Sequence, residues 1–95
     1  MLNARLTVVN ELGLHARAAA NLVKSVSSYQ SSVKLSRLDM SRTADAKSIL
    51  SVLALAATKG TVLEITVEGP DEDEALVALK SAFDSGFGEI TEQTL

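Results

Sequence analysis

The chain has 95 residues, which suffices for one small domain around a single core. It is 46% hydrophobic but only 3% aromatic, so we expect that core to be aliphatic. The net charge of −3, without a lysine or arginine cluster, argues against nucleic-acid binding. The lack of cysteine excludes disulfides and thiolate metal sites, and the single histidine argues against a transition-metal site. We therefore expect neither a metal nor another cofactor.

The N-terminal residues do not resemble a secretion signal, because no basic stretch precedes an apolar run there. The longest apolar stretch, residues 52–57, is far too short to cross a bilayer. We expect a cytoplasmic protein that does not insert into membranes. The small size and the mixed-charge surface predict a single domain over residues 1–95 and a monomer.

The first part of the chain predicts two strands around a helix. Alternating apolar side chains predict the first strand, at Leu2, Ala4, Leu6 and Val8. A loop over residues 10–14 precedes a helix that begins at Ala16 and ends at Ser27 and Ser28. Apolar residues recur in it at helical spacing, at Ala19, Leu22, Val23 and Val26. Alternation resumes in a second strand, at Val33 and Leu35.

The second part of the chain predicts two more strands and two more helices. We place a third strand near residues 41–44, then a helix over residues 46–57 with Asp45 as its N-cap. Clear alternation predicts the fourth strand, at Leu63, Ile65 and Val67. A last helix follows Asp71, with acidic residues in its first turn and a stop at Gly86. Its core-facing residues are Leu76, Leu79 and Phe83.

The element order is therefore β-α-β-β-α-β-α. The first and fourth strands each have one apolar and one polar face, which suits a sheet covered on one side only. We predict an α+β fold, an open-faced β-sandwich in which three helices cover one face of a four-stranded antiparallel sheet.

His15 is the residue best suited to chemistry. It lies in Gly13-Leu14-His15-Ala16-Arg17, between a glycine-containing loop and an alanine-rich helix, so we expect its imidazole at a helix N-terminus. A neutral imidazole is nucleophilic near pH 7 and can form a phosphoramidate, which readily passes its phosphoryl group on. The first-turn N–H groups and Arg17 would stabilise the added charge. Positive φ at Gly13 would aim the ring outward.

From spacing alone, a second interpretation stays open. His15 is then only a helix cap or a surface residue and Arg17 a solvated charge, because any helix N-terminus is a generic anion site. An enzyme is disfavoured, since no second general base, oxyanion pair or metal cluster lies nearby in the sequence.

Three segments resemble the HPr family, the histidine-containing phosphocarriers of the phosphoenolpyruvate-dependent phosphotransferase system. The first is Gly13-Leu14-His15-Ala16-Arg17-Ala18-Ala19, similar to the family's active-site segment. The second, residues 46–53, is similar to its regulatory serine segment, and the third runs from Gly60 through residues 68–72 to Leu76. Together they span nearly the whole chain in the expected order.

The resemblance implies a carrier rather than an enzyme. Enzyme I, charged by phosphoenolpyruvate, would phosphorylate Nδ1 of His15, and the phosphoryl group would pass to an enzyme IIA component. Arg17 matches the family's phosphate-binding arginine, and the backbones of Ala16 and Ala18 would complete the phosphate site. Ala18 replaces the family's common proline, which predicts altered transfer rates rather than lost function, because proline there would only remove an N–H without a helical partner.

Ser48 matches the regulatory serine of the family, so HPr kinase/phosphorylase is a possible partner. With Asp45 as N-cap, Ser48 would be the third residue of its helix, where serines are ordinarily structural or solvated. A phosphate there would add about −1.5 to −2 charge and repel an acidic partner. A second departure from the family is the connection over residues 37–43, which lacks an Asn-Gly turn and leaves the register of the third strand open.

The helix over residues 46–57 is more apolar than one buried face requires. Val52 and Leu55 can fill the core. The apolar residues that remain on this helix would then form an exposed patch near His15 that docks enzyme I, as the family resemblance implies. Alternatively, these remaining residues also belong to the core. We assign this docking surface to Ala20, Lys24, Ile49, Leu50 and Leu53.

Two rival functions remain. Residues 83–89 and Gly69-Pro70 also resemble the nitrogen-related branch of the family, which signals instead of feeding sugar uptake. A regulatory binding module acting through phospho-Ser48 is the other rival, although the retention of His15 with Arg17 argues against it.

Overall fold

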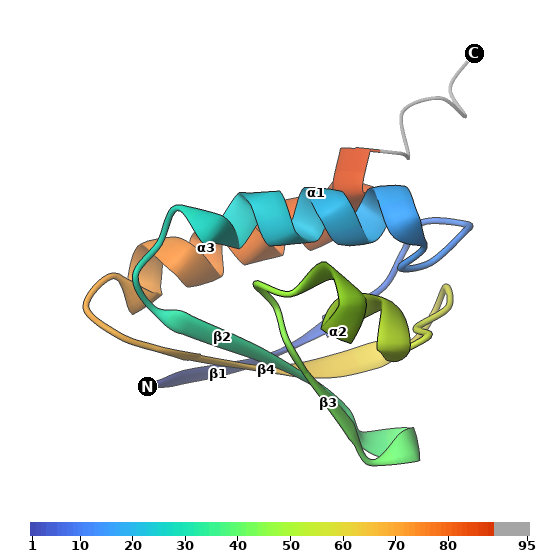
Figure 1. The fold of residues 1–95 in the computed structure, drawn as a ribbon, viewed down its shortest axis with the longest axis horizontal. Coiled ribbons are helices and arrows are strands. Elements are labelled where there is room, and N and C mark those ends of the chain that lie inside the picture. The colour runs from blue at the N-terminus through green and yellow to red at the C-terminus, as the bar shows by residue number, and fades with distance from the viewer. Residues whose placement is uncertain (89–95) are drawn as a thin grey trace.

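In a computed structural model, residues 1–88 are described, and they form one antiparallel sheet with three helices over one face (Figure 1). The strands are β1 (Leu2–Thr7), β2 (Ser32–Arg37), β3 (Arg42–Asp45) and β4 (Val62–Glu68). The helices are α1 (Ala16–Ser27), α2 (Ile49–Ala54) and α3 (Glu72–Asp84), with 3-10 helices η1 (Leu38–Met40) and η2 (Gly86–Gly88). The predicted α+β class and element order are confirmed.

The strand order in the sheet is β1-β4-β2-β3, with every neighbouring pair antiparallel. Strand β4 lies between β1 and β2, and its Ile65 is paired with Ala4 on one side and Leu35 on the other. This arrangement brings the loop after β1 beside the loop before β4. The Val8 N–H donates to Thr61 O over 2.9 Å, and the Gly60 N–H donates to Val8 O over 2.7 Å. Two loops far apart in sequence therefore meet at one end of the sheet.

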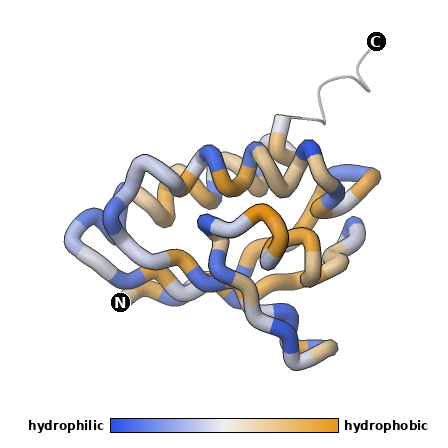
Figure 2. Tube along the Cα trace, in the orientation of Figure 1, coloured by the Kyte–Doolittle hydropathy of each residue, from blue (hydrophilic) through white to orange (hydrophobic). Residues whose placement is uncertain are grey.

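The core lies between the sheet and the helices, and it is mainly aliphatic as predicted. Hydrophobic and hydrophilic residues alternate along the sheet (Figure 2). Fully buried strand residues are Val33, Leu35, Leu63, Ile65 and Val67, and the helices add Leu22, Val26, Val52, Leu79 and Phe83. Burial of each such side chain contributes about 1.5–3 kcal/mol relative to exposure.

The second helix is shorter than predicted, and its N-cap is a different residue. Helix α2 spans Ile49–Ala54, and Ser48 is its N-cap. Asp45 belongs instead to β3, and its carboxylate accepts a hydrogen bond from the Lys47 N–H. The prediction of Asp45 as N-cap, with Ser48 inside the helix, is therefore wrong. The pairing of β3 with β2 extends through Asp45, and that pairing delays the start of the helix.

The β2–β3 connection departs from a simple hairpin turn. Helix η1 and Ser41, which has a φ of 52°, connect the strands, so β3 begins one residue later than predicted. Arg37 is then paired with Arg42. Like charges directly opposite each other are unfavourable in a sheet. This pairing is accommodated because both guanidinium groups donate hydrogen bonds to carbonyl groups at the end of α2.

Helix α3 matches its prediction closely. Acidic residues occupy its first turn, and Gly86, with a φ of 61°, follows the C-cap Ser85. Leu79 and Phe83 are buried, while Leu76 is half-buried against the core. The resemblance of residues 83–89 to the nitrogen-related branch includes Glu89, which lies outside the described residues.

Asp71, just before α3, ties this helix to the loop between α1 and β2. Its carboxylate accepts hydrogen bonds from the Ser31 hydroxyl and from the N–H groups of Gln30 and Ser31, both over 2.9 Å. The Ser31 hydroxyl, followed by the Gln30 N–H, holds the pKa of Asp71 below the ordinary value of 3.8. The ionised carboxylate therefore stabilises the fold at neutral pH.

Candidate functional site

The loop before His15 is a tight turn closed by Asn10. The buried Asn10 side chain donates from Nδ2 to Gly13 O over 2.7 Å, and the Gly13 N–H donates to Asn10 O over 3.1 Å. Gly13 has a φ of +66°, which confirms the expected left-handed conformation. A Cβ at this position would lie 2.4 Å from Ala57 O. Glycine is required both by the backbone conformation and by the close approach of residue 57.

A second contact fixes the loop before His15 to the segment that follows α2. The Leu14 N–H donates to Ala57 O over 2.9 Å, and the Leu14 side chain is buried in the core. The segment that follows α2 thus fixes the residue immediately before His15. Sequence reasoning did not anticipate this contact, because the partners are 43 positions apart and meet only in the folded chain.

His15 is the N-cap of α1, as the sequence predicted. Its backbone is extended, with φ −76° and ψ −176°, and its carbonyl oxygen accepts the Ala19 N–H over 2.8 Å. Its Nδ1 accepts a hydrogen bond from the Arg17 N–H over 3.4 Å. A ring nitrogen that accepts a hydrogen bond presents its lone pair rather than a proton. The lone pair of Nδ1 is therefore directed at the first turn of α1.

The predicted phosphate-binding residues surround this cap. Ala16, Arg17 and Ala18 are the first three residues of α1, whose N–H groups have no acceptor within a helix. Ala16 and Arg17 are exposed, whereas the Ala18 side chain is buried, so Ala18 can present only its backbone. Because residue 18 is alanine rather than proline, this turn retains an additional N–H donor.

Ser48 lies at the opposite end of α2 from the segment that contacts the His15 loop. Its hydroxyl oxygen accepts a hydrogen bond from the Ser51 N–H over 3.3 Å. The side chain is half-buried. The hydroxyl thus already caps α2, and serine is a favoured residue for this role.

The predicted docking residues are unequally exposed. Ile49 is 42% exposed and Leu50 is 79% exposed, while Val52 and Leu55 fill the core as predicted. Leu53 is half-buried and packs against the core, so the alternative assignment to the core applies mainly to this residue. Ala20 and Lys24 are exposed on α1, which packs against α2. An apolar surface is therefore present on α2, made of Ile49 and Leu50.

Within residues 1–88, no group of three or more metal-binding side chains is found. None of the helices in that part of the chain is long and apolar enough to cross a membrane.

Comparison with known proteins assigns the chain to a family. Residues 2–85 match the family model described as the phosphorylation site of the phosphotransferase-system component HPr. The chain belongs to the HPr family. The phosphocarrier protein HPr of Xylella fastidiosa (strain Temecula1) is 47% identical over 91 residues, which cover 96% of this chain and all of that relative. This HPr-family chain has the general role of a phosphocarrier in the phosphotransferase system.

Further similarities agree with this assignment. A crystal structure of HPr from Thermoanaerobacter tengcongensis matches with a TM-score of 0.87 at 35% identity, covering 94% of this chain and 98% of that one. The phosphocarrier protein NPr of Escherichia coli is 39% identical over 82 residues, or 86% of this chain and 90% of the relative. The predicted family resemblance is confirmed, and relatives include both HPr and NPr proteins.

Proposed function

We propose that this HPr-family protein accepts a phosphoryl group from phosphorylated enzyme I on His15 and passes it to an enzyme IIA component. The lone pair of Nδ1 attacks the phosphorus atom, a phosphorus–nitrogen bond forms, and the bond to the donor residue of enzyme I breaks. The donor keeps the electron pair of the broken bond. At the acceptor, a nucleophile of the IIA component attacks the same phosphorus atom, the phosphorus–nitrogen bond breaks, and Nδ1 of His15 recovers its lone pair.

The orientation of Nδ1 at the N-terminus of α1 carries this proposal. The atom that must attack already lies where a helix presents N–H donors and the positive end of its dipole. When Nδ1 forms its new bond, the Arg17 N–H loses its acceptor and becomes available to a phosphoryl oxygen. The hydrogen bond from the Arg17 N–H to Nδ1, which caps the helix in the unmodified protein, is thereby replaced by a hydrogen bond from the same N–H to the phosphoryl group.

Arg17 is proposed as the phosphate partner, together with the backbone N–H groups of Ala16 and Ala18. Arg17 lies two residues after His15, and its side chain is exposed. Its guanidinium group can donate two parallel hydrogen bonds to phosphoryl oxygens, which a lysine cannot match.

Docking of enzyme I and of the IIA component is proposed at the apolar surface of Ile49 and Leu50, with Ala20, Lys24 and Leu53 around it. Ile49 and Leu50 are consecutive and both exposed, and contiguous exposed apolar surface is typical of protein–protein interaction sites. Both partners would use this surface in turn, because both must reach the same histidine.

Ser48 is proposed as a regulatory phosphorylation site for HPr kinase/phosphorylase. A phosphate on its hydroxyl would add about −1.5 to −2 charge next to Ile49 and Leu50. That charge would weaken docking of an acidic partner without unfolding the protein, because a phosphoryl oxygen can replace the hydroxyl as the acceptor for the Ser51 N–H.

The test is phosphorylation by enzyme I with labelled phosphoenolpyruvate, comparing wild type with two His15 variants. His15→Ala removes both the nucleophile and the cap, whereas His15→Asn keeps a good capping oxygen and removes only the nucleophile. We expect acid-labile label on wild type and none on either variant, with His15→Asn retaining most of the thermal stability. An unlabelled wild type, with the same enzyme I active on another carrier, refutes the proposal.

The NPr similarity supports a second candidate, a regulatory carrier of the nitrogen-related branch. Both roles use the same chemistry at His15, so the acceptor distinguishes them. Labelled carrier can be offered to a sugar-specific IIA and to a nitrogen-type IIA from the same organism. Faster transfer to the nitrogen-type acceptor favours the signalling role, and faster transfer to the sugar-specific acceptor favours transport.

A further inference from the structure

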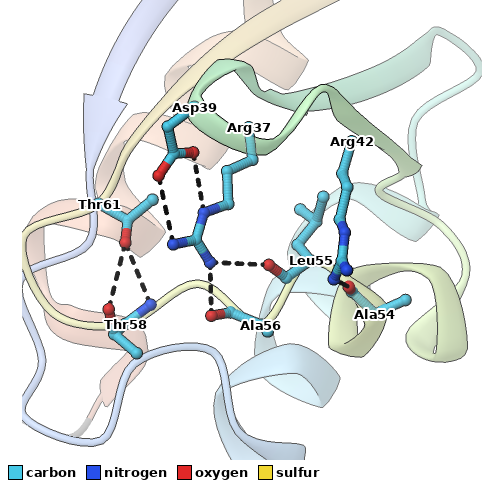
Figure 3. Close-up of polar contacts among 8 residues, drawn as sticks. All are labelled: Arg37, Asp39, Arg42, Ala54, Leu55, Ala56, Thr58 and Thr61. Atoms are coloured by element: carbon cyan, nitrogen blue, oxygen red, sulfur yellow. Dashed lines mark hydrogen bonds and ion pairs between the residues drawn. The ribbon is translucent and has the colours of Figure 1, made fainter.

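Arg37 is a nearly buried cation outside the site described above. It ends β2, and its side chain is only 11% exposed. Asp39 fixes the guanidinium from one side, with Nε to Oδ1 at 3.0 Å and Nη2 to Oδ2 at 3.4 Å (Figure 3). Asp39 itself is 62% exposed. The ion pair thus holds the guanidinium in one orientation while its third nitrogen points toward the end of α2 (Figure 3).

That third nitrogen, Nη1, bonds two consecutive backbone carbonyl groups. It donates to Leu55 O over 2.9 Å and to Ala56 O over 2.6 Å. Ala56 has a φ of 52°, a left-handed conformation that an alanine adopts only when its surroundings enforce it. The two hydrogen bonds from Arg37 hold the carbonyl on each side of the Ala56 Cα atom, and the Ala56 N–H also donates to Leu53 O over 3.0 Å.

The residue after Ala56 is the one that holds the His15 loop. Ala57 O accepts the Leu14 N–H, and the same oxygen lies 2.4 Å from the position that a Cβ of residue 13 would occupy. A rotation of the backbone at residue 56 would move Ala57 O and, through it, Leu14 and the cap residue His15. Hydrogen bonds thus connect Asp39 through Arg37 to the backbone of residues 55 and 56, the chain itself continues to Ala57, and a further hydrogen bond connects Ala57 to the loop before His15.

We propose that Arg37 is a positioning residue for phosphoryl transfer: by clamping the left-handed turn at Ala56, it holds Ala57 O against the His15 loop and sets the place of Nδ1. This inference rests on the proposed function of His15. Its expected effect is on the rate of the transfer step more than on partner affinity, because the described contacts of Arg37 are all internal.

Arg42 offers a matched control. It lies opposite Arg37 in the β2–β3 pair and donates to Ala54 O over 3.0 Å, one residue before the clamped turn (Figure 3). It is exposed, and its hydrogen bond to Ala54 O does not involve residues 55–57. Removing Arg42 therefore removes the same charge near the same helix end but leaves the clamp intact.

The experiment compares Arg37→Met, Arg37→Lys and Arg42→Met with wild type. Phosphorylation by enzyme I is measured over a range of carrier concentrations, and amide hydrogen exchange is followed at Leu14 and at Ile65 in the sheet. For Arg37→Met we expect kcat to fall about threefold to tenfold with little change in KM, since small misplacements of a reacting atom slow chemistry. The rate of amide hydrogen exchange at Leu14 should rise by about threefold to tenfold, which is the effect expected when its one hydrogen bond to Ala57 O is lost. The exchange rate at Ile65 should not change equally.

Arg37→Lys keeps the positive charge but replaces the planar guanidinium group with one ammonium group. Its kcat and its Leu14 exchange rate should therefore lie between those of wild type and Arg37→Met. Arg42→Met should behave as wild type. If Arg37→Met does not fold, Arg37→Lys and Asp39→Asn provide the same test with milder changes. Unchanged kcat and Leu14 exchange in a folded Arg37 variant overturn the proposal, as does equal slowing by Arg42→Met. An unlabelled wild type refutes the proposed function instead, and Leu14 exchange then still tests the clamp.

Discussion

Gly13→Ala should destabilise the protein through the contact between the His15 loop and the segment after α2. An alanine at φ +66° costs about 1–2 kcal/mol in a left-handed conformation. Its Cβ would lie 2.4 Å from Ala57 O and 2.9 Å from the Thr58 Cα atom, both backbone atoms that cannot rotate away. Relief of such overpacking typically costs about 1–3 kcal/mol. Reduced freedom of the unfolded chain returns about 0.4–1 kcal/mol, which leaves a net loss of roughly 1–5 kcal/mol.

Gly60→Ala is the matched control for this substitution. Gly60 has a φ of +90°, which is also unfavourable for alanine, but within residues 1–88 no atom other than those of Gly60 and its two chain neighbours lies within 4 Å of the position that a Cβ would occupy. The difference between the two variants therefore isolates the steric contact with Ala57 and Thr58. The free energy of unfolding is measured by urea titration with far-UV circular dichroism as the signal. If Gly13→Ala loses no more stability than Gly60→Ala, the close approach between the two loops does not constrain the fold.

Three further outcomes are expected. Asp71→Asn should lower the stability of the fold at neutral pH and flatten the decline of stability in acid. A carboxylate whose pKa is lowered in the folded state stabilises the fold above its unfolded pKa, and that stabilisation disappears as pH falls from about 3.8 through the lower folded value. The urea midpoints of wild type and variant should therefore converge between pH 7 and 2, and parallel curves would contradict this. Arg17→Met should slow phosphorylation more than Arg17→Lys while changing the melting temperature little, since Arg17 is exposed; equal rates for the two variants in the enzyme I assay would argue against bidentate phosphate binding. Leu50→Ser should raise the KM for enzyme I while shifting stability by no more than about 0.5 kcal/mol, whereas Val77→Ser, at a residue 67% exposed on α3, should leave KM unchanged.

Local sequence patterns were sufficient to predict most secondary structure. The alternation in β4 and the helical spacing in α1 predicted elements that the fold retains, because in both cases the buried face is encoded by residues close in sequence. The boundaries of α2 were predicted less well. Asp45 is a good capping residue in isolation, but pairing with β2 keeps it in a strand and leaves capping to Ser48. Tertiary pairing outweighed a local preference there.

The sequence by itself determined that His15 begins a helix, that Gly13 precedes it in a left-handed turn, and that an apolar segment follows Ser48. Those features depend on neighbours within a few residues, so they can be inferred without a fold. Only the tertiary structure decided that Arg37 bonds the backbone of residues 55 and 56 and that Ala57 holds Leu14. These contacts join segments that are distant along the chain, and their partners are backbone carbonyl groups. Every residue has a backbone carbonyl, so the sequence carries no pattern that marks which ones will be used.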